Sequence, residues 1–360
     1  MEEGFDFGLI GHLESWDQAV RLMAQWRPPE QGVLTEEDIK PLYGWIPPRE
    51  IFRIEARSIC QSEPVRGLYI ETFIPPDALG RTAFYQNLER VRKAMQRAAR
   101  LGTGVVTLGG FTSILLEGGG EKEVPEGIAF TTGNSLTAAL IVKATEMAAA
   151  KLGMDLRGSA IGVIGSTGDI GTAVCRYFKG KTKEIVLCAR NRRRLERQMK
   201  ELEDGQACRI AEGVAEALAG SDILICVAST EEPEFDLALC REGALVCDAG
   251  YPKNILPADH PVHLFWGGMG RLLGGARFEP DDMREVYHFP TSDTGHGCLL
   301  ESVLLAMEGR KDSYSKGRGN IGVAEIAEIW AMAEKHGIVP APFMNDRGLW
   351  PPHLQSDNET

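Results

Sequence analysis

The sequence lacks the features that mark membrane, secreted and metal-binding proteins. No uninterrupted apolar run in its 360 residues reaches the roughly 20 that a transmembrane helix requires, and the acidic N-terminus, MEEGFDFG, is unlike a signal peptide. The eight cysteines include no CxxC or CxxH pair, and the seven histidines show no metal-ligand spacing. Cys188, Cys226 and Cys247 fall in predicted buried strands and Cys175 on a predicted helix, a usage that fits a reducing compartment. We therefore expect a cytoplasmic protein without a metal.

Basic residues are fewer than acidic ones. Lys and Arg number 39 against 51 Asp and Glu, so the net charge is −12, which disfavours nonspecific binding to nucleic acid. The basic residues gather in a predicted helix over 81–101 and at 190–194. Each cluster is either a solvated helix face or a docking site for an acidic partner, and the sequence leaves both readings open.

Glycine is concentrated where residues 161–178, IGVIGSTGDIGTAVCRYF, pass from an apolar run to an amphipathic segment. This pattern predicts a buried strand, a tight turn and a helix, which together form a dinucleotide-binding unit. The first glycine permits the turn, the second admits the pyrophosphate and the third lets the helix pack on its strand. The cofactor-binding residues predicted here are Gly165, Ser166, Thr167, Gly168, Asp169, Ile170 and Gly171.

A second apolar strand, 184–190, ends in Arg190. An NAD site has an acidic residue at this position, whereas arginine favours the 2′-phosphate of NADP. Further strands are predicted over 207–211, 222–228, 244–248 and 262–266, and ligands bind at the carboxyl ends of such parallel strands. The sequence therefore adds Arg190, Asn191, Arg192, Ala228, Ser229, Gly250, Tyr251 and Pro252 to the predicted cofactor site.

Cys298 is the predicted catalytic nucleophile. It follows a turn, TSDTGHG over 291–297, and opens an apolar helix. A thiol in the first turn of a helix lies near unpaired N–H groups and the positive end of the dipole, which lowers its pKa and favours the nucleophilic thiolate. The alternative is an ordinary packed cysteine. His296 lies two residues earlier and is a candidate proton donor.

Two other turns place small polar residues directly after predicted strands, at 108–113 and 130–134. Their hydroxyls and backbone N–H groups could reach a substrate, or they could serve only turns and helix caps. The predicted substrate-binding residues are Thr112, Ser113, Thr131, Thr132 and Asn134.

These elements predict an α/β protein with an N-terminal α/β substrate domain over 1–153, a Rossmann-type NADP-binding domain with a parallel sheet over 154–290, and a helical C-terminal segment over 291–350 that carries Cys298. Residues 351–360 have the composition of a disordered tail.

Seven motifs in order resemble those of the cyanobacterial long-chain acyl-[acyl-carrier-protein] reductases, which form fatty aldehydes. They are FGLIGHL from Phe7, LGGFTSI from Leu108, FTTGN from Phe130, GSTGDIGTAVCR from Gly165, ARNxxRL from Ala189, GYPKN from Gly250, and Cys298 ahead of LLxxEG. Segments 27–50, 118–128 and 269–297, the last including His296, depart from the family pattern.

The resemblance implies reduction of a long-chain fatty acyl thioester by NADPH, with Cys298 holding the acyl group as a thioester. It implies acyl carrier protein, or coenzyme A, as the acyl donor, and an aldehyde-deformylating oxygenase of hydrocarbon biosynthesis as a product acceptor. The alternatives are a reductase of the glutamyl-tRNA reductase type, disfavoured by the acidic charge, a shikimate-dehydrogenase-like oxidoreductase, and a non-catalytic NADP-binding sensor.

Overall fold

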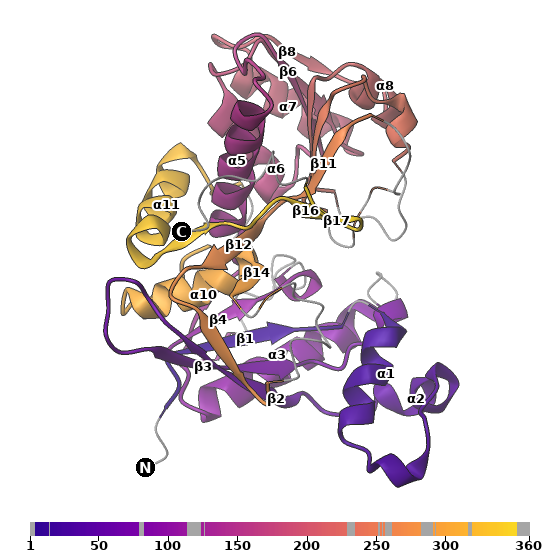
Figure 1. The fold of residues 1–360 in the computed structure, drawn as a ribbon, viewed down its shortest axis with the longest axis vertical. Coiled ribbons are helices and arrows are strands. Elements are labelled where there is room, and N and C mark those ends of the chain that lie inside the picture. Colours follow the sequence, from indigo (N-terminus) through magenta and orange to yellow (C-terminus); the bar gives the residue numbers. More distant parts are fainter. Residues whose placement is uncertain are drawn as a thin grey trace. The chain divides into compact units, whose positions relative to one another are not determined.

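The computed structural model describes most of the chain (Figure 1). The described residues are 4–13, 15–78, 83–113, 124–125, 127–228, 235–250, 253, 255, 261–281, 291, 293–315 and 319–350. They form an α/β protein, as predicted. None of the helices in these ranges combines the length and the apolar character needed to cross a membrane.

The chain divides into two compact units, and each is assembled from separate stretches of sequence. The first comprises Met1–Gly133, Leu272–Gly317 and Met332–Ile338, and the second comprises Asn134–Arg271, Arg318–Ala331 and Val339–Thr360. This division differs from the expected linear boundaries. Residues 134–151 belong with the nucleotide-binding turn, and the segment with Cys298 belongs with the N-terminal strands. The responsible contacts join residues far apart in sequence, which local patterns do not reveal.

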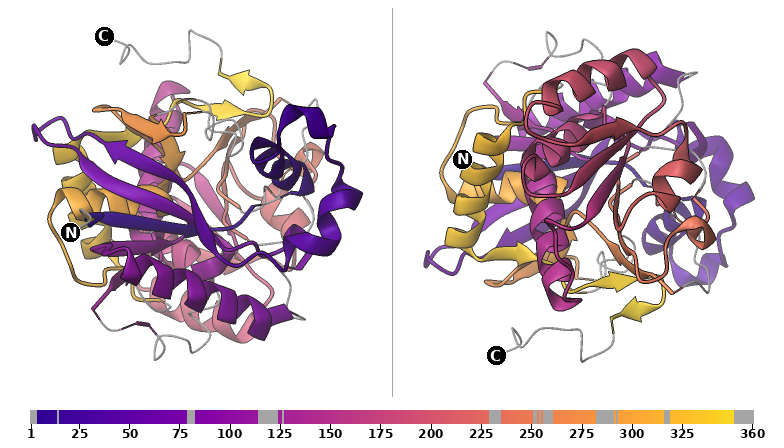
Figure 2. Two further views of the ribbon diagram at one scale, coloured as in Figure 1. Left: turned by 90° about the horizontal axis from the view of Figure 1, so that it is seen from below. Right: turned by 90° about the horizontal axis from the view of Figure 1, so that it is seen from above.

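A six-stranded mixed sheet in the order β13-β2-β3-β1-β4-β5 forms the centre of the first unit. Strands β1, β3, β4 and β5 run parallel, while β2 is antiparallel to β3 and β13 is antiparallel to β2. The strands are β1 (Phe7–Gly11), β2 (Arg49–Ala56), β3 (Val65–Glu71), β4 (Val105–Leu108), β5 (Ala129–Thr131) and β13 (Ala276–Glu279). The left view of Figure 2 shows this sheet.

Alternation along these strands gives the sheet two apolar faces. Ile10 of β1 and Leu68 and Ile70 of β3 pack with Val91 and Met95 of α3 (Phe84–Arg100) in one core cluster. The residues between them, Leu9 and Tyr69, face a pocket lined by α10 (Gly297–Met307). This period of two places a helix on each face, and each fully buried Leu, Ile or Val contributes about 1.5–3 kcal/mol.

The remaining elements of the first unit are short. Helices α1 (Trp16–Gln25) and α2 (Glu36–Tyr43) pack side by side (Figure 1), with 3-10 turns at Pro29–Gln31 and Pro76–Ala78. Thr35 caps α2 through a reciprocal pair of bonds with Asp38. Strand β14 (Thr294–His296) occupies part of the predicted turn before Cys298. It extends because Asp293 O, just before it, accepts the Leu272 N–H (2.7 Å).

The second unit contains the predicted parallel sheet, in the order β11-β10-β9-β6-β7-β8. All of its pairings are parallel, and the order reverses between β6 and β9, as in the Rossmann fold. The strands are β6 (Ala160–Ile164), β7 (Glu184–Cys188), β8 (Cys208–Ile210), β9 (Ile223–Cys226), β10 (Leu245–Asp248) and β11 (His263–Trp266). The Rossmann-type prediction is confirmed.

Helices flank this parallel sheet (Figure 2, right). They are α5 (Asn134–Lys151), α6 (Asp169–Phe178), α7 (Arg192–Leu202) and α8 (Val214–Ala219), with a 3-10 turn at Leu237–Leu239. Helix α11 (Val323–His336) and strands β12 (Met269–Leu272) and β15 (Ile338–Pro340) each contain a point where the chain passes from one unit to the other. Strands β16 (Met344–Asn345) and β17 (Gly348–Leu349) form a terminal hairpin.

Candidate active site

Cys298 lies in the first turn of α10, beside the carboxyl end of β4. The backbone N–H groups of Gly110 and Leu299 hydrogen-bond to its sulfur. A Cβ built on Gly109 would lie 3.9 Å from that sulfur. The predicted LGGFTSI turn and the predicted nucleophile are therefore neighbours within one unit.

The predicted fall in the pKa of Cys298 is wrong for the free protein. Burial raises the pKa of this thiol to about 11, while the N–H bonds from Gly110 and Leu299 lower it and the nearby Glu301 raises it further. Desolvation outweighs the helix terminus because protein atoms surround much of the thiol, although Cys298 as a residue is only half-buried. The thiol is thus protonated at neutral pH, and the backbone donors can stabilise negative charge only once it develops.

Gly133 is the residue that lets the FTTGN turn approach Cys298. Its φ is +74°, and a Cβ built there would lie 2.2 Å from the Cys298 Cα and 2.5 Å from its carbonyl oxygen. Only glycine fits both the left-handed backbone and the contact. The close approach brings the turn after β5 against the first turn of α10.

A buried carboxylate, Glu301, fastens these two elements together. It lies one turn after Cys298 and is fully buried. Thr131 Oγ1 and Ser315 Oγ both donate to its Oε1, the latter at 2.7 Å, and Thr131 Oγ1 accepts the N–H groups of Gly133 and Ser315. The sequence analysis did not identify Glu301. Its signal was a lone charge inside the apolar run LLESVLL.

The hydroxyls predicted to bind substrate differ in their hydrogen bonds. Thr112 Oγ1 donates to Gly109 O (2.8 Å) and Ser113 Oγ donates to Gly110 O (2.9 Å), so both stabilise the turn itself. Thr131 bonds to Glu301. The Thr132 hydroxyl, in contrast, is buried and has no hydrogen-bond partner in the described part of the chain.

Two histidines differ in their suitability for proton transfer. His296 is half-buried at the N-cap of α10 and makes no capping bond there. His12 is buried, donates from Nδ1 to Leu13 O (3.0 Å) and accepts the Phe111 N–H at Nε2 (3.1 Å). Burial lowers the pKa of His12 to about 4, so its ring is neutral and structural.

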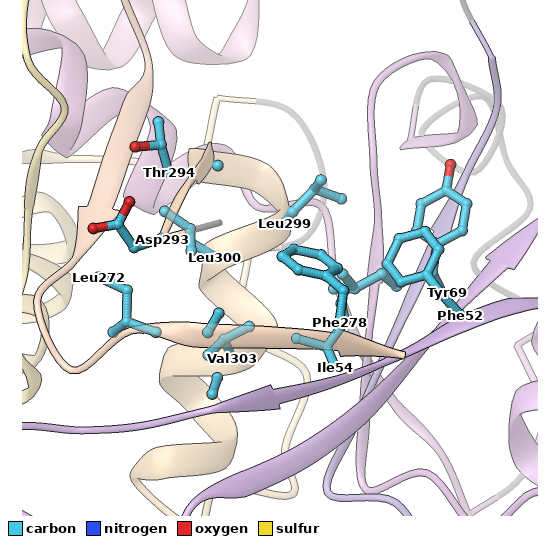
Figure 3. Close-up of a pocket in the computed structure, with 14 residues that line it drawn as sticks. Phe52, Ile54, Tyr69, Leu272, Phe278, Asp293, Thr294, Leu299, Leu300 and Val303 are labelled. Atoms are coloured by element: carbon cyan, nitrogen blue, oxygen red, sulfur yellow. The ribbon is translucent and has the colours of Figure 1, made fainter. Parts of the chain in front are cut away.

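An apolar pocket lies alongside the first two turns of α10 (Figure 3). The space in it that a water-sized sphere can enter is about 50 Å³, below the range of about 300–1,000 Å³ typical of small-molecule sites. A long ligand would therefore enter only if the lining side chains moved apart. Nearly all of its lining is aliphatic or aromatic. The lining residues are Leu9, Phe52, Ile54, Ala56, Tyr69, Leu272, Ala276, Phe278, Asp293, Thr294, Gly295, Leu299, Leu300 and Val303.

The walls of this pocket suit a flexible hydrocarbon. Phe52 stacks on Tyr69 with ring centroids 4.8 Å apart, and Phe278 tilts against Phe52 at 5.5 Å. In Figure 3 these rings face Leu299, the residue that follows Cys298. The pocket therefore reaches Leu299, the sequence neighbour of Cys298, and its apolar walls match the chemistry of a hydrocarbon chain.

In the second unit the glycine turn fits a dinucleotide. Gly165 has φ +86°, and a Cβ there would lie 2.8 Å from Ala228 N, across the point where strand order reverses. A Cβ on Gly171 would lie 2.3 Å from Gly165 O, whereas Gly168 is exposed at the N-cap of α6. No side chain caps this helix within the described residues, and the buried Ser166 hydroxyl has no partner among them.

These features leave an open cradle of backbone N–H groups at the carboxyl ends of β6 and β9. Thr167, Asp169 and Ile170 are half-buried along it. Asn134 donates to Asp169 Oδ2 (3.1 Å). It therefore stabilises the nucleotide-binding turn and not the Thr131–Thr132 turn with which it was grouped.

The end of β7 supplies the predicted phosphate-binding residues. Arg190 is exposed and forms no ion pair with any described residue. Asn191 Oδ1 accepts the Arg194 N–H and so caps α7, while Arg192 pairs with Glu196 (3.3 Å). Of the two arginines predicted to bind the 2′-phosphate, Arg190 is therefore the one without an ion pair to a described residue. Gly250 is buried, with its N–H donated to Asp248, and the predicted residues Ser229, Tyr251 and Pro252 lie outside the described ranges.

Helix α3 carries the first basic cluster, and most of its charges are engaged. Arg90 is half-buried and donates to the carbonyls of Ile46 (2.9 Å) and Thr72 (3.2 Å), and burial lowers its pKa. Arg92 and Lys93 both pair with Glu89, and Arg97 pairs with Glu50. Arg90 is therefore a structural residue and not part of a docking face.

Comparison with known proteins identifies proteins that this chain resembles. A long-chain acyl-[acyl-carrier-protein] reductase of Synechococcus elongatus is 30% identical over 357 residues, covering 93% of this chain and 98% of that protein. The aminotransferase PigE of a Serratia species is 24% identical, covering 71% of this chain and 30% of that protein. Glutamyl-tRNA reductase of Methanopyrus kandleri, a solved structure, aligns with a TM-score of 0.28 and 17% identity, over 72% of this chain and 58% of that one. No family model matches the sequence.

Proposed function

Since this chain belongs to the long-chain acyl-[acyl-carrier-protein] reductase family, we propose that it reduces a long-chain fatty acyl thioester to a fatty aldehyde with NADPH through an acyl group held on Cys298. The observation that carries this proposal is the apolar pocket that reaches Leu299, next in sequence to Cys298. Among the eight described cysteines, Cys298 is the one in the first turn of a helix. An acyl chain in that pocket would present its thioester carbonyl to the sulfur.

Acyl transfer to Cys298 is the first chemical step. The sulfur attacks the carbonyl carbon, a new carbon–sulfur bond forms, and the bond to the donor's sulfur breaks. The proton of the Cys298 thiol leaves with the donor, which departs as a free thiol. His296, at the N-cap of α10, is the proposed proton carrier.

The oxyanion formed during this attack needs fixed donors. The N–H groups of Gly110 and Leu299 hydrogen-bond to the sulfur and so stabilise negative charge on the thiolate. The proposed oxyanion donor is the unpartnered Thr132 hydroxyl, which follows the residue that Glu301 holds in place. Such preorganised donors contribute about 3 kcal/mol each when charge develops. Glu301 acts through Thr131 and is a positioning residue.

The cradle formed by Gly165, Gly168 and Gly171, together with Arg190, is the proposed binding site for NADPH. The cofactor, when bound, supplies the hydride that reduces the acyl-cysteine, after which the aldehyde and the thiol are released. The backbone N–H groups at the start of α6 would hold the pyrophosphate, and Arg190 would hold the 2′-phosphate. A glutamyl-tRNA-reductase-type activity is disfavoured because the pocket beside Cys298 lacks basic lining residues.

The test is an acyl adduct formed without NADPH. The protein is mixed with palmitoyl-carrier protein, and peptide mass spectrometry is used to locate the acyl group. We expect an adduct on Cys298 that the Cys298→Ala variant lacks and the Cys208→Ser variant keeps. A Cys298→Ala protein that still makes aldehyde at the wild-type rate would contradict the covalent mechanism.

The remaining inferences rest on the family. We propose acyl carrier protein as the acyl donor, an aldehyde-deformylating oxygenase as the acceptor of the product, and a cytoplasmic location.

A further inference from the structure

A nucleophile–histidine–carboxylate cluster lies at the C-terminal end of α10, away from Cys298. Ser58 Oγ is 2.8 Å from His336 Nδ1, and His336 Nε2 is 2.8 Å from Glu308 Oε1. Cys60 Sγ lies 3.2 Å from Ser58 Oγ and 3.5 Å from His336 Nδ1. Glu308 is the C-cap of α10, about 15 Å along the helix from Cys298, so this cluster takes no part in the reaction proposed above.

The hydrogen bonds fix the tautomer of His336. A carboxylate can only accept, so Nε2 carries the proton that it donates to Glu308. Nδ1 is therefore the basic nitrogen, and it faces Ser58 and Cys60. Lys335 also donates to Glu308 Oε1 (2.9 Å). Burial alone would raise the pKa of Glu308, but hydrogen bonds from Lys335 and His336 lower it, so the carboxylate is charged.

The ring of His336 is held rigidly. It is fully buried, and its carbonyl accepts the N–H of Ile59 (3.3 Å), which lies between Ser58 and Cys60. The Cys60 N–H in turn donates to Ser58 Oγ (3.1 Å). The base and the two nucleophiles therefore belong to one interlocked arrangement, which is the geometry that activates a nucleophile.

Exposure separates the two nucleophiles. Ser58 is buried, while Cys60 is exposed. Of the eight cysteines in the chain, all of which the structure describes, Cys60 is the only exposed one. A solution reagent therefore reaches the thiol first, and Ser58 is placed to relay its proton to His336.

We propose that Cys60 is a modification site that forms mixed disulfides with low-molecular-weight disulfides, with His336 as the base and Glu308 as its positioning residue. Disulfide exchange suits the site because it needs an accessible, deprotonated sulfur and no oxyanion donors.

In the proposed exchange one sulfur–sulfur bond replaces another and one proton is carried by His336. The Cys60 thiol proton passes to His336 Nδ1, directly or through Ser58 Oγ. The sulfur attacks one sulfur of the disulfide, a new sulfur–sulfur bond forms and the old one breaks. The leaving thiolate takes the proton from His336 and departs as a thiol, so Cys60 is oxidised and the incoming disulfide is reduced.

The test measures the rate at which oxidised glutathione modifies Cys60 at pH 7, followed by peptide mass spectrometry in the full-length protein. We expect a mixed disulfide at Cys60 that forms about tenfold or more faster than in the His336→Gln variant. The matched control is His263→Gln, a half-buried histidine of the second unit, which should leave the rate unchanged.

Because His336 is buried, its replacement could unfold the first unit, so Glu308→Gln provides a second variant. Glu308 is 19% exposed, and its replacement should slow the modification and shift its pH profile while the thermal unfolding temperature stays near that of the wild type. Equal rates for wild type and a folded Glu308→Gln protein, or modification at other cysteines before Cys60, would overturn the proposal.

Discussion

Several individual residues position Cys298 for the proposed acyl transfer. Gly133 makes room for its backbone, Gly110 and Leu299 supply N–H groups to its sulfur, and Glu301 holds the turn that contains Gly133. None of these residues is chemically reactive in the proposed mechanism. Their effect is geometric, and it can be separated from ordinary backbone strain.

A Gly133→Ala substitution tests this geometric role. The added methyl group would overlap Cys298 Cα, so we expect a stability loss of about 3 kcal/mol or more and a large fall in the rate of acyl-adduct formation. Gly127→Ala is the matched control, since Gly127 also has a positive φ (+83°) but open space around it. It should lose only about 1–2 kcal/mol from strain and keep adduct formation. Denaturant titration and adduct kinetics measure both effects.

His12 predicts a pH dependence of stability. Its pKa falls from about 6.5 in the unfolded chain to about 4 in the folded one because burial disfavours the charged ring. Between these pH values the unfolded chain binds more protons than the folded one. The free energy of unfolding is therefore unaffected by His12 above pH 6.5 and falls as the pH drops toward 4. The loss amounts to about 3 kcal/mol.

This dependence is checked by urea titrations at a series of pH values. The unfolding free energy of wild type should fall more steeply than that of His12→Gln between pH 6.5 and 4. Parallel curves for the two proteins would show that His12 is not the titrating group.

At the scale of elements, helix α10 combines two tasks. Its first turn presents Cys298, and Leu299, Leu300 and Val303 line the apolar pocket. In the proposed mechanism one helix therefore both carries the acyl group and lines the space for its chain, and substitutions along α10 should separate these two roles.

A Val303→Phe substitution narrows the pocket (Figure 3). We expect the reaction of the longest acyl donors to slow by about tenfold, while short acyl donors react as in wild type. Ala306→Phe is the control, because Ala306 is half-buried on the same helix but outside the pocket lining. An equal effect of Val303→Phe on all chain lengths would argue that the pocket does not hold the chain.

The end of β7 provides the second element-level prediction. An Arg190→Ala variant should bind NADPH about tenfold to a hundredfold more weakly and bind NADH as before. Arg192→Ala should have little effect on either, since Arg192 already pairs with Glu196. Fluorescence titration of both cofactors measures the difference, and equal weakening for NADH would remove the assignment of Arg190 to the 2′-phosphate.

At the scale of the whole molecule, the net charge is −12, so the proposed carrier-protein donor, which is itself acidic, requires a local basic surface. On α3, Arg92, Lys93 and Arg97 are paired with acidic residues, whereas Arg193 and Arg194 of α7 are exposed and form no ion pairs within the described residues. The cluster on α7 is therefore the stronger docking candidate.

Charge reversal tests the docking site. The double variant Arg193→Glu, Arg194→Glu should raise KM for the acyl-carrier substrate about tenfold, in a salt-dependent way, and leave KM for a neutral acyl-pantetheine unchanged. Arg92→Glu with Lys93→Glu serves as the comparison on α3. If neither pair changes KM for the carrier substrate, docking does not use these clusters.

The fold was predictable where the signal was local. The strand, glycine turn and helix around Gly165 were identified from 18 consecutive residues, and the motif order led to the family. The membership of α5 in the second unit, the bond between Asn134 and Asp169, and the pairing of β13 with β2 depend on distant contacts. The high pKa of Cys298 was missed because a helix terminus is visible in sequence, whereas the burial that opposes it is not.

The interleaved assembly of the two units has a consequence for biosynthesis. The edge of β2 that faces away from β3 pairs with β13, which is synthesised more than 200 residues later. The whole parallel sheet of the second unit, from Ala160 to Trp266, leaves the ribosome in between. The middle of the chain can therefore fold while the N-terminal strands still expose an open edge, a condition that favours aggregation. The growing polypeptide should depend most on chaperones in the interval before Ala276 is synthesised.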